Sequence, residues 1–344
     1  KFFFSTLSGT ILSAIIGITM GYMGYGVWAL VTQTLTATIG STVVLWFTVE
    51  FRPSLIFSFQ RLQSLFSYGW KILFSTLLGT FYSSLRNLII GKMYSTADLA
   101  YYNKGEQFPN LIIININSTI DNVLLPAMAN VQNNLDNVKF MARKAIRTSS
   151  YMLWPCMVGL FVCAEPLVSI VLTDKWIEIV PYLRIFCIIY AFLPIQTTNT
   201  TTLKAIGKSD VLLKVEITKK IIGIISILLS MHYGVYCITL AALIVTPIEM
   251  FINIYPNKHF INYSFYEQLT DILPSILLST AMGFSIWWLQ YLALPNILIL
   301  GLQISLGMFI YILLSFIFKV EQFKYVLSVA KTLINKFKFK IKKA

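Results

Sequence analysis

The stretch ILPSILLSTAMGFSIWWLQYLALPNILILGLQISLGMFIYILLSFIF, residues 272–318, contains no Asp, Glu, Lys or Arg. A transmembrane helix needs about 20 mainly apolar residues, so this stretch is long enough to cross a bilayer twice. Pro295 separates two candidate spans, Ile272–Leu294 and Ile297–Phe318. Lys319 follows at once, as basic residues do at the cytoplasmic end of a span. This segment therefore predicts a pair of membrane-spanning helices.

The rest of the chain repeats this pattern. Of its 344 residues, 57% are hydrophobic and only 12% are charged, whereas soluble domains carry about 25% charged residues. Eight more candidate spans precede the pair: Phe3–Tyr22, Val27–Val49, Tyr68–Ile90, Phe108–Met128, Ser149–Leu172, Ile177–Leu203, Val211–Met231 and Val235–Tyr255. The sixth and seventh contain QTTNTTT (196–202) and KVEITKK (214–220), which predict broken or partly solvated helices. We expect an all-α, polytopic transmembrane bundle of about ten helices.

The basic residues indicate the orientation of the bundle. When alternate loops are assigned to opposite sides of the membrane, most of the 27 Lys and Arg residues fall on the same side. The exceptions are Lys92, Lys104, Lys175 and Arg184 on the other side and Arg86 within a span. Since cytoplasmic loops carry the excess of Lys and Arg, both ends of the chain are predicted to be cytoplasmic. The net charge of +13 is then a topology signal, and no nucleic-acid partner is expected.

Two amphipathic segments suggest the domain organisation. Residues 54–67 predict an interfacial helix that links the last two helices of an N-terminal lobe (1–53) to a six-helix lobe (68–258). A terminal helix pair (259–318) and a basic amphipathic tail (319–344) follow, and the tail is expected to lie on the anionic inner leaflet. The chain begins with Lys1 directly before an apolar span, and we expect that it lacks an N-terminal portion.

Signals for enzymatic chemistry are absent or incomplete. The GKS of residues 207–209 lacks the glycine that a phosphate-binding loop needs five residues earlier, where Thr202 stands. There are two histidines, no HExxH motif, and four cysteines without metal-type spacing. We therefore expect no catalytic residues, no metal and no cofactor.

Polar residues within spans are the remaining candidates for a site, because they are costly in lipid and usually face a cavity or a partner helix. Arg86 and Asn87 lie in the third span, and Asn115, Asp121 and Asn122 lie in the fourth. We expect Arg86 and Asn115 at similar depth, where a guanidinium facing amides forms a receptor for a diphosphate. The alternatives are that Arg86 pairs with Asp121 or extends to the membrane surface, and that the asparagines only join helices.

Two acidic residues are candidates for ion coupling. Glu249 lies in the eighth span beside Pro247, and Glu216 lies among Lys214, Lys219 and Lys220. Carboxylates inside a membrane carry protons or bind ions in transporters, which leaves both proton and sodium coupling open. For Glu216, pairing with a lysine three or four residues away is the competing interpretation.

Several motifs resemble the Wzx-type polysaccharide flippases, which belong to the superfamily of the multidrug and toxin extrusion (MATE) transporters. The matching stretches cover most of residues 20–225: GYGVWALVTQTL (24–35), RNLIIGKMYSTADLAYYNKGEQFPN (86–110), VLLPAMANVQNN (123–134), LTDKW (172–176) and GKSDVLLKVEITKK (207–220). Where family members often have Gly, this chain has Ala100. The resemblance implies a MATE-like, two-lobed transporter that lacks its first four helices here.

The resemblance also implies a function. Such proteins move an undecaprenyl-diphosphate-linked oligosaccharide across the bacterial cytoplasmic membrane by alternating access, in contact with membrane lipids and alongside a polymerase and glycosyltransferases. Two alternatives stay open. A MATE-type drug or cation exporter would favour acidic cavity residues, and a membrane polysaccharide polymerase or acyltransferase would need catalytic residues on a large outer loop. The basic balance and the short outer loops, such as residues 232–234, argue against both.

Overall fold

The computed structural model describes residues 2–49, 58–292, 294–325 and 327–328, and every regular element there is a helix. This confirms the all-α class. The chain divides into two compact units, Lys1–Gln63 and Ser64–Ala344. The division falls within the predicted linker 54–67, of which residues 54–57 lie outside the described residues. Within the predicted tail, residue 326 and residues 329–344 also lie outside them.

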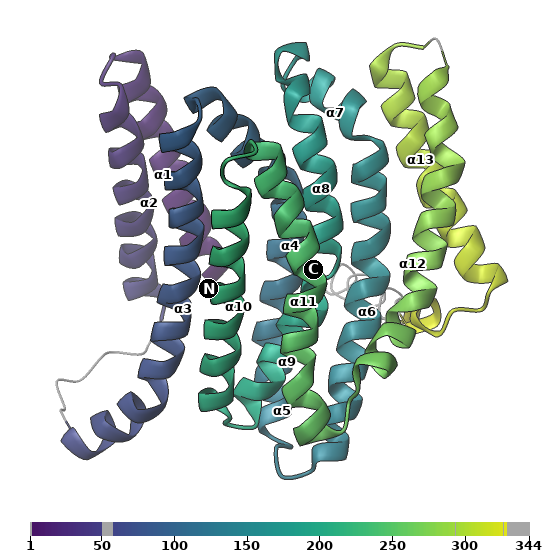
Figure 1. Cartoon of the computed structure of the whole chain (residues 1–344). Helices are drawn as coiled ribbons and strands as arrows, with labels where there is room; N and C mark the ends of the chain where they lie inside the picture. Colours follow the sequence, from purple (N-terminus) through teal and green to yellow (C-terminus); the bar gives the residue numbers. More distant parts are fainter. Residues whose placement is uncertain (1, 50–57, 293, 326, 329–344) are drawn as a thin grey trace, which may run out of the picture. The chain divides into compact units, whose positions relative to one another are not determined.

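Unit 1 contains a tight helical hairpin, α1 (Phe2–Tyr22) and α2 (Val27–Thr48) (Figure 1). Gly24 and Gly26 make the turn with positive φ angles of 79° and 54°, which glycine adopts without strain. Small residues then bring the two helices together. A Cβ at Gly9 would lie 2.7 Å from the carbonyl oxygen of Ala37, and Ser5 Oγ donates to the carbonyl oxygen of Ser41 at 2.5 Å. Such close backbone packing is typical of helix pairs in membranes.

Helix α3 (Phe59–Met93) runs without a break through the second half of the predicted linker and the third predicted span. Residues 59–66 therefore start a long helix and do not form a separate one. Side chains join α3 to α10 (Ser209–Ser230): Lys71 pairs with Asp210, and Tyr82 packs against Gly223. A Cβ at Gly223 would lie 2.7 Å from the Tyr82 ring, so only glycine allows this approach.

The other helices of unit 2 stand roughly side by side (Figure 1). In chain order they are α4 (Thr96–Thr119), the π-helical turn η1 (Ile120–Leu124), α5 (Leu125–Ala129), α6 (Leu135–Val162), α7 (Ala164–Val171), the 3-10 turn η2 (Asp174–Ile179), α8 (Val180–Ala191), α9 (Leu193–Ala205), α11 (Val235–Ile261), α12 (Phe265–Trp287), the 3-10 turn η3 (Trp288–Tyr291) and α13 (Asn296–Ile317). Helix α6 packs against α8 and α12, and α8 also packs against α4 and α11.

All ten predicted spans fall on helices, although not all are equally apolar. Among the described residues, seven helical segments are long and apolar enough to cross a membrane, and α6 with α7 makes an eighth that is bent by 71°. The third and seventh predicted spans correspond to α3 and α10, which do not meet that criterion. In α10 the reason is a group of four charged residues, Lys214, Glu216, Lys219 and Lys220. Lys219 and Lys220 lie in the middle of the helix, whereas the charge count had treated them as loop residues.

The sixth predicted span is a broken helix, which is one of the two forms that its polar residues predicted. Helix α8 ends at Ala191 and α9 begins at Leu193, with Pro194 at its start, where the missing N–H of proline is tolerated. Its polar residues are not solvated, however. Thr198 and Thr201 are fully buried, and Asn199 exchanges hydrogen bonds with the Gln268 amide of α12 at 2.8 and 3.1 Å.

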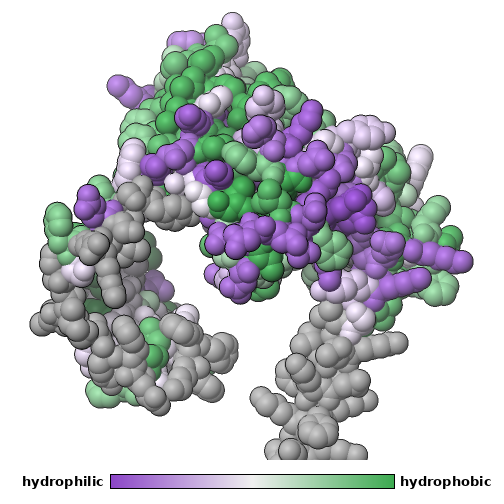
Figure 2. Space-filling model, turned by 90° about the horizontal axis from the view of Figure 1, so that it is seen from below, coloured by the Kyte–Doolittle hydropathy of each residue, from purple (hydrophilic) through white to green (hydrophobic). Residues whose placement is uncertain are grey.

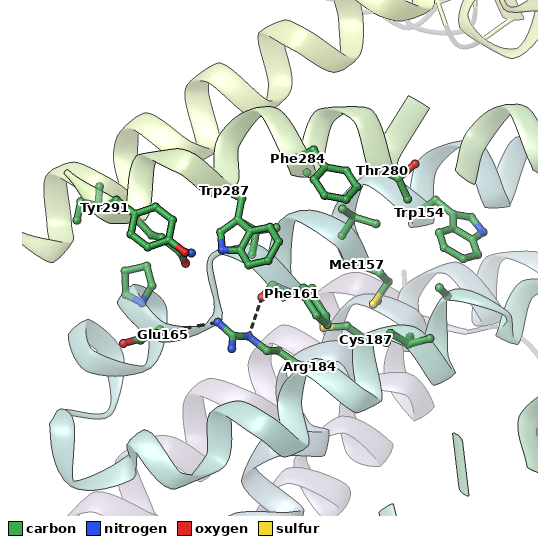
Figure 3. A pocket seen from close by; sticks show the side chains of 18 of the residues that line it. Trp154, Met157, Phe161, Glu165, Arg184, Cys187, Thr280, Phe284, Trp287 and Tyr291 are labelled. Atoms are coloured by element: carbon green, nitrogen blue, oxygen red, sulfur yellow. Dashed lines mark hydrogen bonds and ion pairs between the residues drawn. The ribbon is translucent and has the colours of Figure 1, made fainter. Parts of the chain in front are cut away.

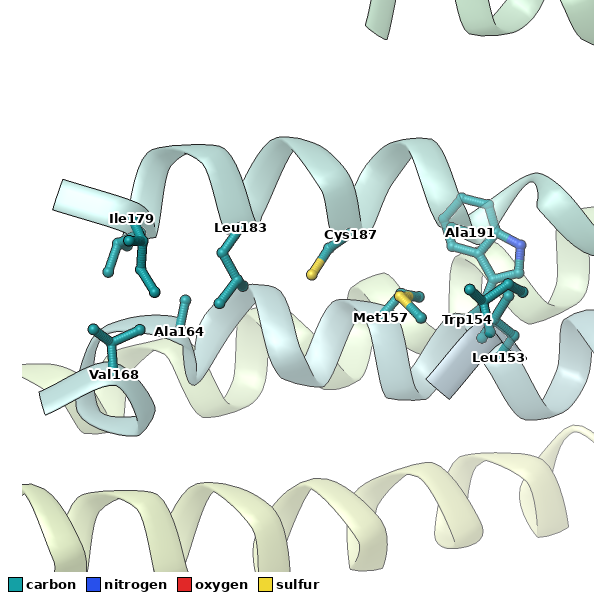
Figure 4. Packing of buried hydrophobic residues seen from close by; sticks show 11 residues of the cluster. Leu153, Trp154, Met157, Ala164, Val168, Ile179, Leu183, Cys187 and Ala191 are labelled. Atoms are coloured by element: carbon teal, nitrogen blue, oxygen red, sulfur yellow. The ribbon is translucent and has the colours of Figure 1, made fainter. Parts of the chain in front are cut away.

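The apolar core of unit 2 consists of several clusters, and one of the two with most buried residues lies where α4, α6, α7 and α8 meet (Figure 4). Along the two helices, Leu153 of α6 lies beside Ala191 of α8, Met157 lies between Ala191 and Cys187, and Ala164 of α7 lies opposite Leu183. These side chains are at most 1% exposed. The long apolar side chains interdigitate with small ones, so the helices can pack closely in the way that membrane helices require.

An ionic clamp joins α6 to α12. Asp271 of α12 is 5% exposed and accepts four hydrogen bonds of 2.6–2.9 Å from the guanidinium groups of Arg143 and Arg147 on α6. The Tyr263 hydroxyl donates a fifth at 2.8 Å, and burial together with the Asp271 carboxylate raises the pKa of Tyr263 and keeps its proton in place. Helix α6 begins near the lower end of the molecule in Figure 1, where the view from below shows hydrophilic residues gathered (Figure 2).

We predict that Asp271→Asn lowers the stability of the complete protein in detergent by about 3 kcal/mol. This is the lower end of the cost of breaking a buried ion pair, because both arginines are partly exposed. Thermal unfolding followed by size-exclusion chromatography measures the loss. The control is Glu321→Gln, which removes a largely exposed partner of Arg147 at 3.7 Å and should change little. Equal effects of the two variants would show that Asp271 clamps nothing.

The helix ends also allow a test of the predicted topology. Reporter proteins fused at His232, in the turn between α10 and α11, and at Lys208, in the turn between α9 and α10, should lie on opposite sides of the membrane. We expect alkaline phosphatase to be active only at His232 and green fluorescent protein to fluoresce only at Lys208, because the basic loops are cytoplasmic. The reverse pattern would contradict the charge count, and both reporters on one side would show that α10 does not span.

Candidate functional site

Arg86 lies on the side of α3 that faces α4 and α10. Its Nη1 donates a hydrogen bond of 2.7 Å to the hydroxyl of Tyr102, and its guanidinium carbon lies 4.7 Å from the centroid of the Tyr82 ring. Tyr82 and Arg86 are four residues apart, so helical periodicity places them on one face of α3. The Nε of Arg86 is buried and has no hydrogen-bond partner among the described residues. One donor of a membrane-embedded cation is therefore left unused.

The two tyrosines are held rigidly. Tyr102 on α4 is 1% exposed and meets the rings of Tyr182 and Phe186 edge to face, with centroid distances of 6.5 and 5.2 Å. Tyr82 is fixed by its close approach to Gly223. Aromatic faces attract cations, so the Tyr82 ring and the Tyr102 hydroxyl together can keep the guanidinium of Arg86 in place.

Lys220 of α10 shares the Tyr82 ring with Arg86, and its Nζ lies 4.9 Å from the ring centroid. The neighbouring Lys219 is 5% exposed and forms an ion pair of 2.5 Å with Glu216, one turn earlier on the same helix. Glu249 of α11 interacts electrostatically with both lysines, with Glu216 and with Arg86. We call Tyr82, Arg86, Tyr102, Glu216, Lys219, Lys220 and Glu249 the Tyr82 cluster. It contains three cations and two carboxylates.

A polar hollow of about 330 Å³ lies along α4, and its lining residues lie just before and just after Tyr102 in the sequence. Its lining includes Asn103, Lys104, Glu106, Gln107 and Asn110. Glu106 connects the hollow to the interior, because it accepts a hydrogen bond from the hydroxyl of Tyr190, whose ring packs against Phe186 and so lies next to Tyr102. The hollow presents amides, one carboxylate and the ammonium of Lys104, all of which can form hydrogen bonds with hydroxyls.

The structure brings together only some of the predicted site residues. Arg86, Glu216 and Glu249 share the Tyr82 cluster, although the sequence analysis assigned them to separate roles. The predicted pairing of Glu216 with a lysine is present. Asn87 lies beside Arg86 and is exposed. Lys219, Lys220, Tyr82 and Tyr102 were missed as site residues. The available signals were the charged residues 214–220 inside a predicted span and the four-residue spacing of Tyr82 and Arg86.

The expectation that Arg86 and Asn115 lie at similar depth is wrong. Arg86 is level with Tyr102, and Asn115 is thirteen residues further along α4, or about 20 Å. The reason is that α4 begins at Thr96, because Ser95 and Asp98 form a capping box, whereas hydropathy had placed the start of the span at Phe108. The Nδ2 of Asn115 donates to the carbonyl oxygen of Leu111 in its own helix.

Asp121 does not pair with Arg86 either. It lies on the π-helical turn η1, accepts a hydrogen bond of 2.6 Å from Thr201 Oγ1 and lies 3.9 Å from Lys204 Nζ, both on α9. Asn122 is exposed on the same turn. π-Helical turns are frequent at functional sites. Asn115 and Asp121 thus have their own partners, and neither contacts the Tyr82 cluster in any hydrogen bond or ion pair of the described residues.

Comparisons with known proteins agree with this architecture. The chain is 23% identical over 206 residues to the succinoglycan biosynthesis transport protein ExoT of Rhizobium meliloti (strain 1021), covering 58% of this chain and 41% of that protein. It is 22% identical over 250 residues to the lipopolysaccharide biosynthesis protein WzxC of Escherichia coli (strain K12), covering 72% and 48%. With the teichuronic acid biosynthesis protein TuaB of Bacillus subtilis (strain 168), identity is 24% over 165 residues, covering 47% and 33%. The chain thus spans half or less of each relative's length.

The fold is also similar to that of a solved structure. The lipid II flippase MurJ in an inward closed conformation superimposes with a TM-score of 0.69 at 18% identity, over 90% of this chain and 66% of that one. Residues 1–181 match the profile of a family described as polysaccharide biosynthesis protein. Because this match covers more than half of the 344 residues, the chain belongs to the polysaccharide biosynthesis protein family, and the family resemblance seen in its motifs is confirmed.

Proposed function

We propose that the complete protein moves a lipid-linked oligosaccharide with a diphosphate headgroup across the bacterial cytoplasmic membrane for the assembly of a surface polysaccharide. It works as a transporter and not as an enzyme, by alternating access. The family match and the similarity to a transport protein and to a lipopolysaccharide biosynthesis protein support this role. A polymerase and glycosyltransferases would supply and use the substrate on either side.

The observation that carries this proposal is the partly buried Arg86, whose buried Nε is an unused donor. A cation in a membrane helix is costly unless it is paired or functional, and Arg86 has no carboxylate within ion-pair distance among the described residues. A guanidinium is planar and binds phosphate oxygens in pairs. The diphosphate would bind the unpaired Nε of Arg86, once the conformational change of alternating access exposes this buried atom, and the ammonium of Lys220, which shares the Tyr82 ring.

The acidic residues of the Tyr82 cluster provide a means of coupling. Glu216 and Glu249 offset much of the charge of Arg86, Lys219 and Lys220 when no substrate is present. Neutralising Glu249, with a proton or with a sodium ion, would increase the net positive charge around Tyr82 and so favour an anionic headgroup. Release of the ion on the other side would lower the affinity again.

The α4 hollow is suited to the sugar portion. Asn103, Gln107 and Asn110 lie at spacings of three and four and share one helical face. Amides both donate to and accept from hydroxyl groups, and Glu106 accepts from them. Since Glu106 contacts Tyr190, next to the aromatic surroundings of Arg86, one substrate could place its diphosphate near Tyr82 and its first sugars along α4.

We predict that Arg86→Ala in the complete protein reduces polysaccharide export 10- to 100-fold, which corresponds to the loss of about 1.5–3 kcal/mol for one charged hydrogen bond. Surface polysaccharide in a deletion strain complemented with the variant measures the effect, with the amount of protein in the membrane as the check on folding. Lys92→Ala removes an exposed cation from the same helix and should leave export unchanged. Normal export by a well-expressed Arg86→Ala variant would contradict the role of Arg86.

We predict further that Glu249→Gln uncouples transport from its driving ion. In proteoliposomes the unmodified protein should move the lipid-linked oligosaccharide faster when a proton gradient or a sodium gradient is imposed, and the gradient that works identifies the ion. The variant should respond to neither, because its side chain is permanently neutral. Glu178→Gln, an exposed carboxylate on η2, is the control. A variant that still responds to the gradient would exclude Glu249 as the coupling residue.

A further inference from the structure

A second cavity, distinct from the Tyr82 cluster, lies between α6, α7 and α8 on one side and α12, η3 and α13 on the other (Figure 3). Its volume is about 840 Å³, within the range of pockets that hold whole ligands. Apolar side chains, among them Met157, Cys187 and Phe284, line its interior. The sequence offered no signal for it, because it is formed by residues from six elements.

The mouth of this pocket carries one charge of each sign. Arg184 of α8 and Glu165 of α7 face each other there (Figure 3), with a nitrogen–oxygen distance of 4.0 Å. Among the described residues, Arg184 makes one further hydrogen bond, a long one of 3.4 Å from Nε to the carbonyl oxygen of Phe161, and its guanidinium carbon lies 5.7 Å from the centroid of the Phe161 ring. Both side chains are partly exposed, at 34% and 63%. At these distances the two groups are close but not tightly bound, so each has capacity left for another partner.

Aromatic side chains place the mouth at the edge of the membrane. Trp287, Trp288 and Tyr291 stand at the end of α12 and in η3, and they are 46%, 75% and 72% exposed. Trp and Tyr gather where lipid headgroups meet the hydrocarbon region. Trp287 and Tyr291 also line the pocket. The apolar interior therefore extends from headgroup depth into the hydrocarbon region, which is the arrangement of a phospholipid.

We propose that this pocket binds a zwitterionic phospholipid such as phosphatidylethanolamine from the adjacent leaflet. One acyl chain would fill the apolar interior, the phosphate would bind the Arg184 guanidinium, and the ammonium would bind the Glu165 carboxylate. The pair of opposite charges selects this headgroup, because an anionic lipid would meet repulsion from Glu165. The lipid would join α12 and α13 to α6 and α8, and its binding is independent of the proposed transport function.

Lipid binding to the purified complete protein tests this proposal. Delipidated protein is mixed with phosphatidylethanolamine or with phosphatidylglycerol, and bound lipid is measured by native mass spectrometry and by thermal stabilisation. We expect phosphatidylethanolamine to bind more tightly, and Arg184→Gln and Glu165→Gln each to weaken its binding roughly tenfold. Lys175→Gln removes a nearby exposed cation that does not line the pocket and should bind phosphatidylethanolamine normally.

A second pair of variants tests the apolar interior. Thr280→Trp places a large ring inside the pocket, whereas Ser285→Trp places the same ring on an exposed position of α12 outside it. Only Thr280→Trp should lose the lipid. Unchanged binding by Arg184→Gln and Glu165→Gln, or a preference for phosphatidylglycerol, would overturn the proposal. Competitive displacement by a polyprenyl diphosphate would also overturn it, because the pocket would then belong to the substrate.

Discussion

Polar groups in the hydrocarbon interior of a membrane have no water to bind, and they must find partners within the protein. For the backbone this requirement leaves only helices among the described residues. For buried polar side chains the same lack of water explains contacts far apart in sequence, both within spans and near the hydrophilic end of the bundle. Two arginines surround Asp271, Asn199 exchanges hydrogen bonds with Gln268, and the guanidinium of Arg86 rests on tyrosines. These contacts join α12 to α6 and to α9, and they join α3 to α4. They fix the position of one helix against another, which apolar packing alone would not do.

Hydropathy was sufficient to locate the helices but not to align them. A long apolar run shows that a span exists, and its ends depend on local chemistry such as the Ser95–Asp98 capping box. This is why Asn115 is about 20 Å from the level of Arg86. The charge count had a related weakness, because it assigned Lys219 and Lys220 to a loop, although Glu216 and the Tyr82 ring hold them inside a helix. The pairing within α10 was predictable, since it depends only on residue spacing.

The charges around Tyr82 also bear on the choice between an anionic substrate and a cationic one. An excess of basic residues in the sequence favoured an anionic substrate over a cationic one. In the structure, three basic side chains share their surroundings with two carboxylates, so the local excess of positive charge is small and depends on whether Glu249 is charged. In such a site the preference for an anion or a cation depends more on whether Glu249 is charged than on the number of basic and acidic residues. The unpaired Nε of Arg86 is the observation that favours an anionic substrate over a cationic one.

The glycine contact in unit 1 has a mechanical consequence. With Gly9 against Ala37, almost no side-chain volume separates α1 from α2. Long side chains between helices can change rotamer and let one helix slide on the other, but backbones in direct contact cannot accommodate such sliding. The hairpin should therefore behave as one stiff lever, and any conformational change that reaches it would have to move both helices together.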